Sequence, residues 1–458
     1  MKKYGTIILI LLFFLQLLPV MGHADTAATG GCSSLFADQN LSGNTAYNGT
    51  AKAVILYERN TQTMVYSHNP DEKINPTGLV KLLTALIVLE EGNLDDVVTV
   101  KRSTLNSISP GSVSAGLKAG EQIKLEDLLY CVMVSSANDA AAVAAEHVAG
   151  SQSAFVEKMN ARAATLGCAN THFANVHGLQ DERQYSTARD MAIIVADALK
   201  NEDFVYYFGV TEHTVSATNS SSARRLSTTN YMMDPDSNYF DSRVTGGKPA
   251  AATSADRSVI CTAKVEGSEY LCVVISAKAK MSGNAVTRYT NFDEAADLLD
   301  FGFQGYAIQQ VVGTQQPFGM YPVSGGKNHV VVAPSREMYA LLPVNFNADQ
   351  LQLRDVRDEA SLVAPLDAGA AVGKLQIYFG SLFIGEVELV ARHGVEDFGA
   401  STVSGDSDSS NGGDIVGTIL KVALPIVLVV SLFPVVAVWR KRKGAQKRKS
   451  SINERGAR

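Results

Sequence analysis

Strand patterns at both ends of a long helical stretch constrain the fold of this chain more than any other feature. Residues 53–57 and 258–275 have the apolar, β-branched composition of strands, and the long stretch between them is rich in helical patterns. Strands this far apart in sequence must meet in one sheet, so the arrangement is α+β rather than a series of βαβ units. We therefore predict a domain over residues 51–303 with a mixed sheet and helices on both of its faces. Its core should include Leu82, Leu83, Leu86, Ile87, Leu128, Leu129, Val132 and Val134.

A second, smaller domain follows. Between residues 304 and 397, short alternating runs are separated by Gly, Pro, Asp and Asn, which is the pattern of an all-β domain. The next stretch, residues 398–413, is dominated by Ser, Gly and Asp. Such a composition is typical of a flexible stalk.

The beginning of the chain carries a targeting signal. Two lysines precede an apolar run over residues 7–20, and small residues stand at Gly22 and Ala24. This pattern predicts a secretory signal peptide over residues 1–24, because the run is short for a membrane span. Residues 25–50 then form a spacer before the first domain.

The other end of the chain predicts a membrane anchor. Residues 422–439 carry no charge, and we assign a transmembrane helix to residues 414–439. The basic tail over residues 440–458 begins with RKRK, and such an excess of positive charge marks the cytoplasmic side. We therefore expect a single-pass type I protein of the cell membrane with an extracellular ectodomain. Because the charges directly follow an apolar span, we do not interpret them as a nucleic-acid site.

Charge and cysteine content narrow the choice of partners. The formal net charge of −6 gives no sign of a nucleic-acid partner. The five cysteines are scattered without a CxxC motif or a His/Cys cluster, so we predict no metal and no cofactor. Cys261 and Cys272 lie on two successive strand patterns. A two-residue turn at Gly267 and Ser268 would set Cys261 opposite Val274, and we therefore predict no disulfide between the two cysteines.

Four sequence blocks carry the chemistry. They are NPTGLVKLLTALIVLE from Asn75, LEDLLYCVMVSSANDAAAVAAEHVAG from Leu125, ANTHFANVHGLQDERQYSTARDMA from Ala169 and GGKPAAATSADRSVICTAKVEG from Gly246. In order and spacing they resemble the successive blocks of the low-molecular-weight penicillin-binding proteins, the serine-type D-alanyl-D-alanine carboxypeptidases. Residues 364–392 resemble the small β domain of that family. The resemblance implies a penicillin-binding/β-lactamase-like transpeptidase fold, peptidoglycan D-Ala-D-Ala stem peptides as ligands and cell-wall assembly proteins as partners.

In that family three clusters meet at one cleft. A serine on a first helical turn attacks the peptide carbonyl, and a lysine three residues later takes its proton. A Ser-x-Asn turn relays protons and holds the peptide, and a Lys-Thr-Gly strand supplies positive charge and backbone donors. By this resemblance Lys81 and Ser136 are the catalytic residues that remain. Asn138 and Lys248 are the corresponding substrate-binding residues.

Two of these clusters depart from the family pattern. Gly78 stands where the serine nucleophile belongs, and Pro249 and Ala250 replace the threonine and glycine of Lys-Thr-Gly. Proline has no N–H to donate and fixes its own φ, so we expect this wall of the cleft to change shape. Ala250 adds a Cβ where a ligand must approach the backbone closely. The chain is therefore predicted to be catalytically impaired.

Other interpretations of these residues stay open. Thr77, four residues before Lys81, could supply the hydroxyl of the missing serine, but its Oγ would be displaced from near-attack distance. Ser136 is a relay group in the family pattern and not a nucleophile. Each retained residue also has a purely structural explanation, since a lysine can snorkel from an apolar helix and Ser or Asn can cap a turn. His172 and His177 belong to a structural block and are not predicted ligands.

Three functions follow from these interpretations. The chain is a pseudoenzyme that binds stem peptides or occupies a site in a wall-synthesis or sporulation assembly, an active carboxypeptidase with a rearranged nucleophile, or a membrane scaffold with a dead cleft. The sequence does not separate the first from the third.

Overall fold

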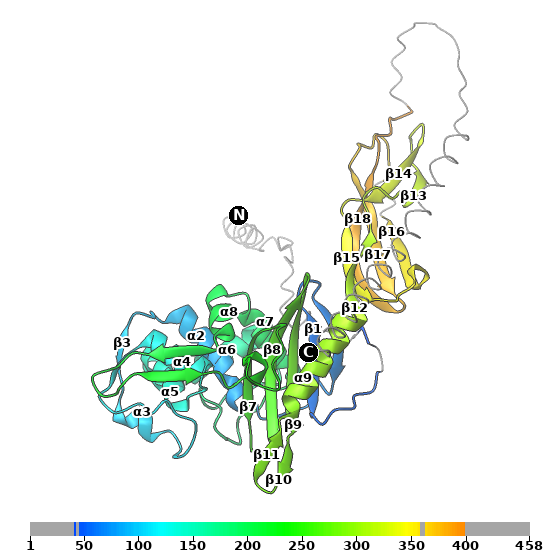
Figure 1. Ribbon diagram of the computed structural model, residues 1–458. Helices are drawn as coiled ribbons and strands as arrows, with labels where there is room; N and C mark the ends of the chain where they lie inside the picture. Colours follow the sequence, from blue (N-terminus) through cyan, green and yellow to red (C-terminus); the bar gives the residue numbers. More distant parts are fainter. Residues whose placement is uncertain (1–40, 43–44, 358–361, 399–458) are drawn as a thin grey trace, which may run out of the picture. The chain divides into compact units, whose positions relative to one another are not determined.

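The fold is seen in a computed structural model that describes residues 41–42, 45–357 and 362–398 (Figure 1). Its central sheet has the strand order β2-β1-β9-β8-β7. The sheet therefore joins strands from both ends of the first domain, as the sequence predicted. The bounds are β1 Ala53–Glu58, β2 Thr63–His68, β7 Val244–Ala251, β8 Asp256–Val265 and β9 Ser268–Lys278.

Helices cover both faces of this sheet. Along β1, Ala53, Ile55 and Tyr57 belong to one buried cluster, whereas Val54 and Leu56 belong to another. Side chains of a strand alternate between faces, so a strand with buried apolar residues on both faces requires cover on both. Figure 1 shows α9 on one face and the remaining large helices on the other. The helix bounds are α2 Val80–Glu91, α4 Leu125–Met133, α5 Asn138–Ala149, α6 Gln152–Thr165, α7 Ala188–Ala198, α8 Glu202–Gly209 and α9 Thr290–Gly305.

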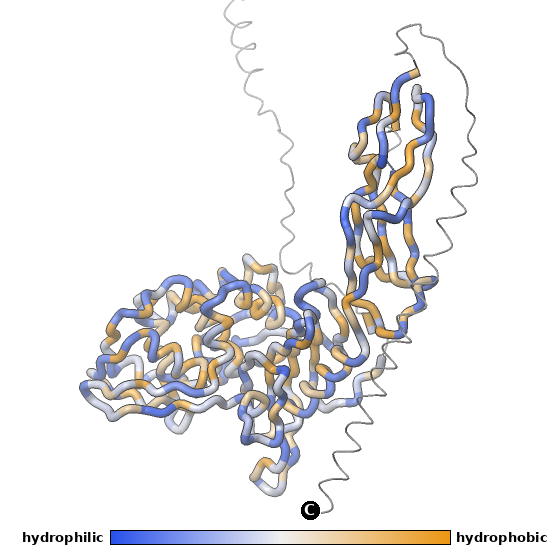
Figure 2. Tube along the Cα trace, turned by 45° about the horizontal axis from the view of Figure 1, so that its top comes forward, coloured by the Kyte–Doolittle hydropathy of each residue, from blue (hydrophilic) through white to orange (hydrophobic). Residues whose placement is uncertain are grey.

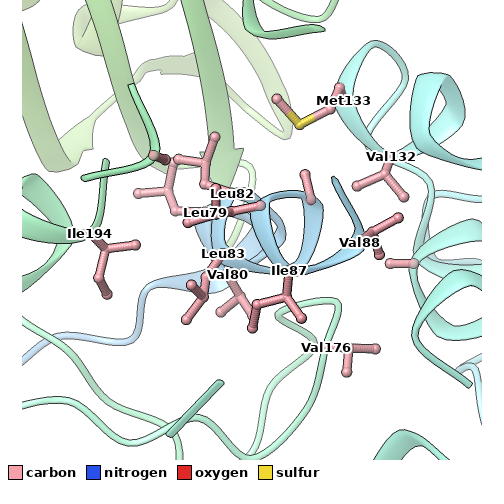
Figure 3. Close-up of a cluster of buried hydrophobic side chains, with 14 of the residues drawn as sticks. Leu79, Val80, Leu82, Leu83, Ile87, Val88, Val132, Met133, Val176 and Ile194 are labelled. Carbon is pink, nitrogen blue, oxygen red and sulfur yellow. The ribbon is translucent and has the colours of Figure 1, made fainter. Parts of the chain in front are cut away.

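The α2 helix lies in the middle of the larger cluster. Figure 3 shows Leu82, Leu83 and Ile87 on this helix, surrounded by apolar side chains from other elements such as Val132 and Ile194. All eight residues predicted for the core are at most 3% exposed. That prediction is confirmed.

The prediction of mixed strand directions is wrong, because every strand pair in the central sheet is antiparallel. The strands β1 and β2, and likewise β8 and β9, follow each other through short turns. Short turns can join only antiparallel neighbours, since a parallel pair needs a long crossover.

The register of the β8–β9 hairpin also corrects a prediction. Val265 pairs with Ser268, so the turn is formed by Glu266 and Gly267, one residue earlier than expected. Both turn residues have positive φ, +37° and +91°, as a type I′ turn requires, and Gly267 takes the second position. Cys261 therefore lies opposite Cys272 rather than Val274, yet both are buried free thiols.

The second domain is all-β, as predicted, with one 3-10 turn (η4, Ala348–Gln350). Its sheet has the order β13-β14-β18-β17-β16, and β12 and β15 form a two-stranded ladder. Apolar and polar segments are interspersed along its strands (Figure 2), and its own buried cluster includes Val330, Leu375 and Leu389. The bounds are β12 Tyr306–Val312, β13 Gly319–Pro322, β14 His329–Pro334, β15 Met338–Pro343, β16 Leu351–Arg357, β17 Ala371–Phe379 and β18 Leu382–Ala391.

Smaller elements complete the first domain. They are the 3-10 turns η2 (Thr77–Leu79) and η3 (Tyr231–Met233), the short helix α3 (Arg102–Asn106), and the two-stranded ladders of β3 (Val97–Thr99) with β4 (Gln122–Lys124), β5 (Glu212–Val215) with β6 (Arg224–Ser227), and β10 (Lys280–Ser282) with β11 (Ala285–Arg288).

Some predicted segments lie outside the described residues. These are the signal peptide, most of the spacer and stalk, the membrane helix and the basic tail. Among the helices that the structure does describe, none combines the length and the apolar character needed to cross a bilayer. The predicted domain boundaries stay predictions.

Candidate functional site

Lys81 lies on the first turn of α2, deep in the domain. Only 2% of its surface is exposed, and its Nζ donates a hydrogen bond of 2.5 Å to the backbone carbonyl of His177. Burial lowers the pKa of Lys81 to about 7, an effect that the charge of Asp139 partly opposes. Near neutral pH a substantial share of these amines is uncharged, which is the form that can accept a proton.

Gly78 lies in the 3-10 turn that leads into α2. A Cβ built at this position would lie 3.8 Å from Lys81 Nζ, 3.8 Å from Ser136 Oγ and 3.4 Å from Ala250 Cβ. A small side chain therefore fits here with little adjustment and would touch groups from all three predicted clusters. The clusters converge as predicted, but glycine brings no side chain to their meeting point.

Ser136 and Asn138 lie in the tight connection between α4 and α5. Ser136 has φ +60°, in the left-handed region, and the following N–H of Ala137 donates to the carbonyl of Cys131 at 3.0 Å. Asn138 begins α5, is 5% exposed, and donates its backbone N–H to the carbonyl of Val113 at 2.9 Å. These two bonds hold the backbone directly after Ser136, and Ser136 Oγ lies 3.8 Å from a Cβ built at Gly78.

Asp139 was not singled out from the sequence. Its carboxylate accepts hydrogen bonds from Ser114 Oγ at 2.6 Å and from the N–H groups of Ala115 and Leu117 at 2.8 and 3.1 Å. These bonds tie the loop before β4 to the start of α5. The one sequence signal for this role is an acidic residue in the first turn of a helix.

Lys248 lies on β7 with only 1% of its surface exposed. Its Nζ donates to the carbonyls of Val132 and Met133 at 2.9 and 3.2 Å, at the end of α4. Burial, with a smaller contribution from the nearby charge of Lys81, lowers the pKa of Lys248 well below its usual range. The structure thus places this amine between β7 and α4, and its substrate-binding role stays a prediction.

Strand β7 forms one wall of the site without the predicted distortion. Its pairing with β8 runs without a shift from Gly246 to Ala251, through Pro249 and Ala250. The expectation that proline changes the shape of this wall is therefore wrong. The physical reason is that β7 is an edge strand, where a proline can sit without interrupting a ladder on both sides.

A pocket of about 220 Å³ opens beside this wall. Three of its lining residues belong to the predicted clusters, namely Ser136, Pro249 and Ala250. The same pocket is also lined by a group that the sequence did not reveal, namely Tyr231, Arg257, Tyr289, Asn291 and Phe292. These residues come from three elements that are far apart in sequence, so no local pattern could have found them.

Among the described residues, the alternative nucleophile Thr77 makes no hydrogen bond with Lys81. Thr77 is 6% exposed, and its Oγ1 has no hydrogen-bond partner among the described residues.

The ring of His177 accepts a hydrogen bond from the N–H of Leu179 at 3.2 Å, and burial lowers the pKa of His177 to about 4. His172 makes a backbone bridge with Tyr185. Within the part of the chain that the structure covers, no group of His, Cys, Asp or Glu could hold a metal ion.

This fold and this arrangement of lysine, Ser-x-Asn turn and edge strand are those of the serine D,D-carboxypeptidase class. The sequence profile of the D-alanyl-D-alanine carboxypeptidase family matches residues 41–279, and that of the penicillin-binding protein 5 C-terminal domain matches residues 310–397. The chain belongs to the D-alanyl-D-alanine carboxypeptidase family.

Among its relatives, the chain is similar to D-alanyl-D-alanine carboxypeptidase DacF from Bacillus subtilis, with 26% identity over 81% of this chain and 92% of that protein. It is 28% identical to D-alanyl-D-alanine carboxypeptidase DacC from Escherichia coli, over 76% and 85% of the two chains. Among solved structures, penicillin-binding protein 5 from Haemophilus influenzae matches with a TM-score of 0.60 and 25% identity. That match covers 78% of this chain and all of the solved one.

Proposed function

We propose that this protein is a pseudoenzyme of the carboxypeptidase family that keeps the cleft for binding peptidoglycan stem peptides, alone or within a wall-synthesis assembly. The observation that carries the proposal is the position of Gly78. A side chain there would lie against both Lys81 Nζ and Ser136 Oγ, so the surrounding machinery has the geometry of an acyl-transfer site without its nucleophile. Binding needs no nucleophile, whereas turnover does.

Binding of the stem peptide can be tested with methionine methyl groups as reporters. Met133 lies at the site, since its carbonyl accepts from Lys248, whereas Met320 is 65% exposed on β13 of the second domain. Titrating the methyl-labelled chain in detergent with a peptide ending in D-Ala-D-Ala should shift the Met133 signal with a Kd of about 1 mM or tighter. The Met320 signal should stay in place.

The same peptide ending in L-Ala-L-Ala is the matched control and should leave Met133 unshifted. If saturating D-Ala-D-Ala peptide left Met133 unchanged, the cleft would not bind stem peptides and the scaffold function would replace this proposal. Release of D-alanine during the titration would instead support an active enzyme.

We also propose that the chain is a single-pass type I membrane protein, on the basis of the uncharged run at 422–439 and the basic residues that follow it. Protease added to intact protoplasts should remove the ectodomain and spare the tail. Antibodies against the tail and the first domain would follow the two fragments on a blot. Digestion of the tail with a protected ectodomain would reverse the orientation.

A further inference from the structure

Two cysteines face each other across the β8–β9 hairpin, inside the central sheet. Cys261 pairs in register with Cys272, and this pairing runs without a shift from Val259 to Val265 at the turn. Both cysteines belong to the buried cluster that α9 covers, and both are 0% exposed. Residues that lie directly opposite each other in a ladder direct their side chains to the same face of the sheet. The two thiols therefore lie side by side.

The spacing of such a pair matches the spacing that a disulfide requires. Cα atoms of opposite residues in an antiparallel ladder are about 4.5 or 5.5 Å apart, according to whether the pair is hydrogen-bonded. A disulfide joins residues whose Cα atoms are about 4.4–6.8 Å apart, so either kind of pair is suitable. The prediction of no bond depended on a register with Val274 opposite Cys261, and the structure has a different register.

The surroundings of the two thiols indicate when a bond can form. Cys272 Sγ donates to the carbonyl of Ala295 on α9 at 3.9 Å. The neighbouring thiol of Cys261, together with burial, raises the pKa of the Cys272 thiol well above its usual range. The thiolate is the reactive form, so the folded, reduced pair should be inert. Because α9 follows β9 in the chain, the hairpin can pair and be oxidised before this helix covers it.

From this geometry we propose that Cys261 and Cys272 form a cross-strand disulfide in the extracellular domain while it folds. One cysteine thiolate attacks the disulfide of an oxidant of the thiol–disulfide exchange class, which gives a mixed disulfide. The second cysteine then displaces the oxidant sulfur and closes the bond. The two cysteines are thus oxidised, and the oxidant is reduced to two thiols that carry the two protons. The inference rests on the proposed location outside the cell, where disulfides persist.

The bond would also stabilise the strand behind one wall of the cleft. On its other side Cys261 pairs with Gly247, the residue before Lys248 on β7. A Cβ built at Gly247 would lie 3.0 Å from Cys261 Cβ, so β7 and β8 are in close contact at this point. A covalent link between β8 and β9 therefore fixes the strand against which Lys248 is placed.

Tryptic mapping tests the bond directly, because Lys264 lies between the two cysteines. The full chain is isolated from cells in detergent, unfolded with N-ethylmaleimide in the absence of reductant, and digested. Peptides 258–264 and 265–278 should appear as one linked species, and a reductant should separate them. The peptide 163–183 is the internal control: it contains Cys168, a free thiol of the other buried cluster, and should carry N-ethylmaleimide.

Unfolding in urea provides a second readout. Reductant should lower the urea midpoint of the native chain, because the disulfide restricts the unfolded chain. In the double variant Cys261→Ala, Cys272→Ala the midpoint should not respond to reductant. The matched control is Cys168→Ala, which also loses a buried thiol but should respond to reductant as the native chain does.

If the two peptides from the native chain appeared separately, each with N-ethylmaleimide on its cysteine, the inference would be overturned. A link from either cysteine to another part of the chain would overturn it as well. Neither result affects stem-peptide binding, which the methionine titration measures. If the protoplast experiment also placed the domain inside the cell, the proposed location would be the step that failed; otherwise the pairing of the two thiols would be.

Discussion

Incubation of the native chain with a β-lactam should leave its intact mass unchanged. Acylation needs an oxygen nucleophile beside Lys81 on the first turn of α2, and Gly78 supplies none. Removing the nucleophile of a serine protease costs about six orders of magnitude in rate, so any residual reaction here should escape detection. Intact-mass spectrometry after prolonged incubation is the measurement.

Restoring the nucleophile should bring back only part of the reaction. In Gly78→Ser the new Cβ fits 3.8 Å from Lys81 Nζ, yet Ala250 Cβ lies 3.4 Å away and Pro249 offers no N–H on the opposite wall. The loss of one such donor costs about 2.7–4 kcal/mol, so we expect at most weak acylation of this variant. Adding Pro249→Thr and Ala250→Gly should raise the rate by much more than the separate effects combined, because all three changes act on one transition state.

The control is the rebuilt strand without the serine, which should form no adduct. A stoichiometric adduct on the native chain would overturn the pseudoenzyme proposal. Peptide mapping of that adduct to Thr77 or Ser136 would identify the nucleophile that replaces the missing serine.

The second large effect is expected at Gly178. This glycine has φ +84°, and a Cβ built there would lie only 1.8 Å from the carbonyl oxygen of Thr77. Gly178→Ala must therefore push the turn at residues 77 and 78 away from its place beside Lys81. We expect a loss of about 3 kcal/mol or more in the free energy of unfolding, from backbone strain and overpacking together. Urea unfolding followed by circular dichroism measures it.

Gly120→Ala separates the two contributions. Gly120 has φ +80°, but a Cβ built there meets nothing within 4 Å, so this variant carries the strain without the clash. It should lose only about 1–2 kcal/mol. Equal losses in the two variants would show that the contact between Gly178 and Thr77 does not matter for stability.

Local patterns in the sequence predicted most of the architecture. The apolar composition of the strands and helices led to an α+β domain followed by an all-β domain, and all eight predicted core residues are buried. The errors concern pairing: the sheet is antiparallel throughout, and the β8–β9 turn lies one residue earlier than predicted. Composition shows which segments form strands, whereas register depends on which residues adopt positive φ in the turn.

Some features of the candidate site likewise follow from the sequence, and others from the folded structure. The sequence alone shows that no hydroxyl stands three residues before Lys81, because Gly78 has no side chain in any conformation. The protonation of that lysine, in contrast, depends on the folded chain, because burial lowers its pKa and the nearby charge of Asp139 partly opposes this. Folding also brings Arg257 and Asn291 into one pocket. Contacts between residues far apart in the chain leave no local periodicity, so the sequence pattern could not reveal this meeting and the tertiary structure could.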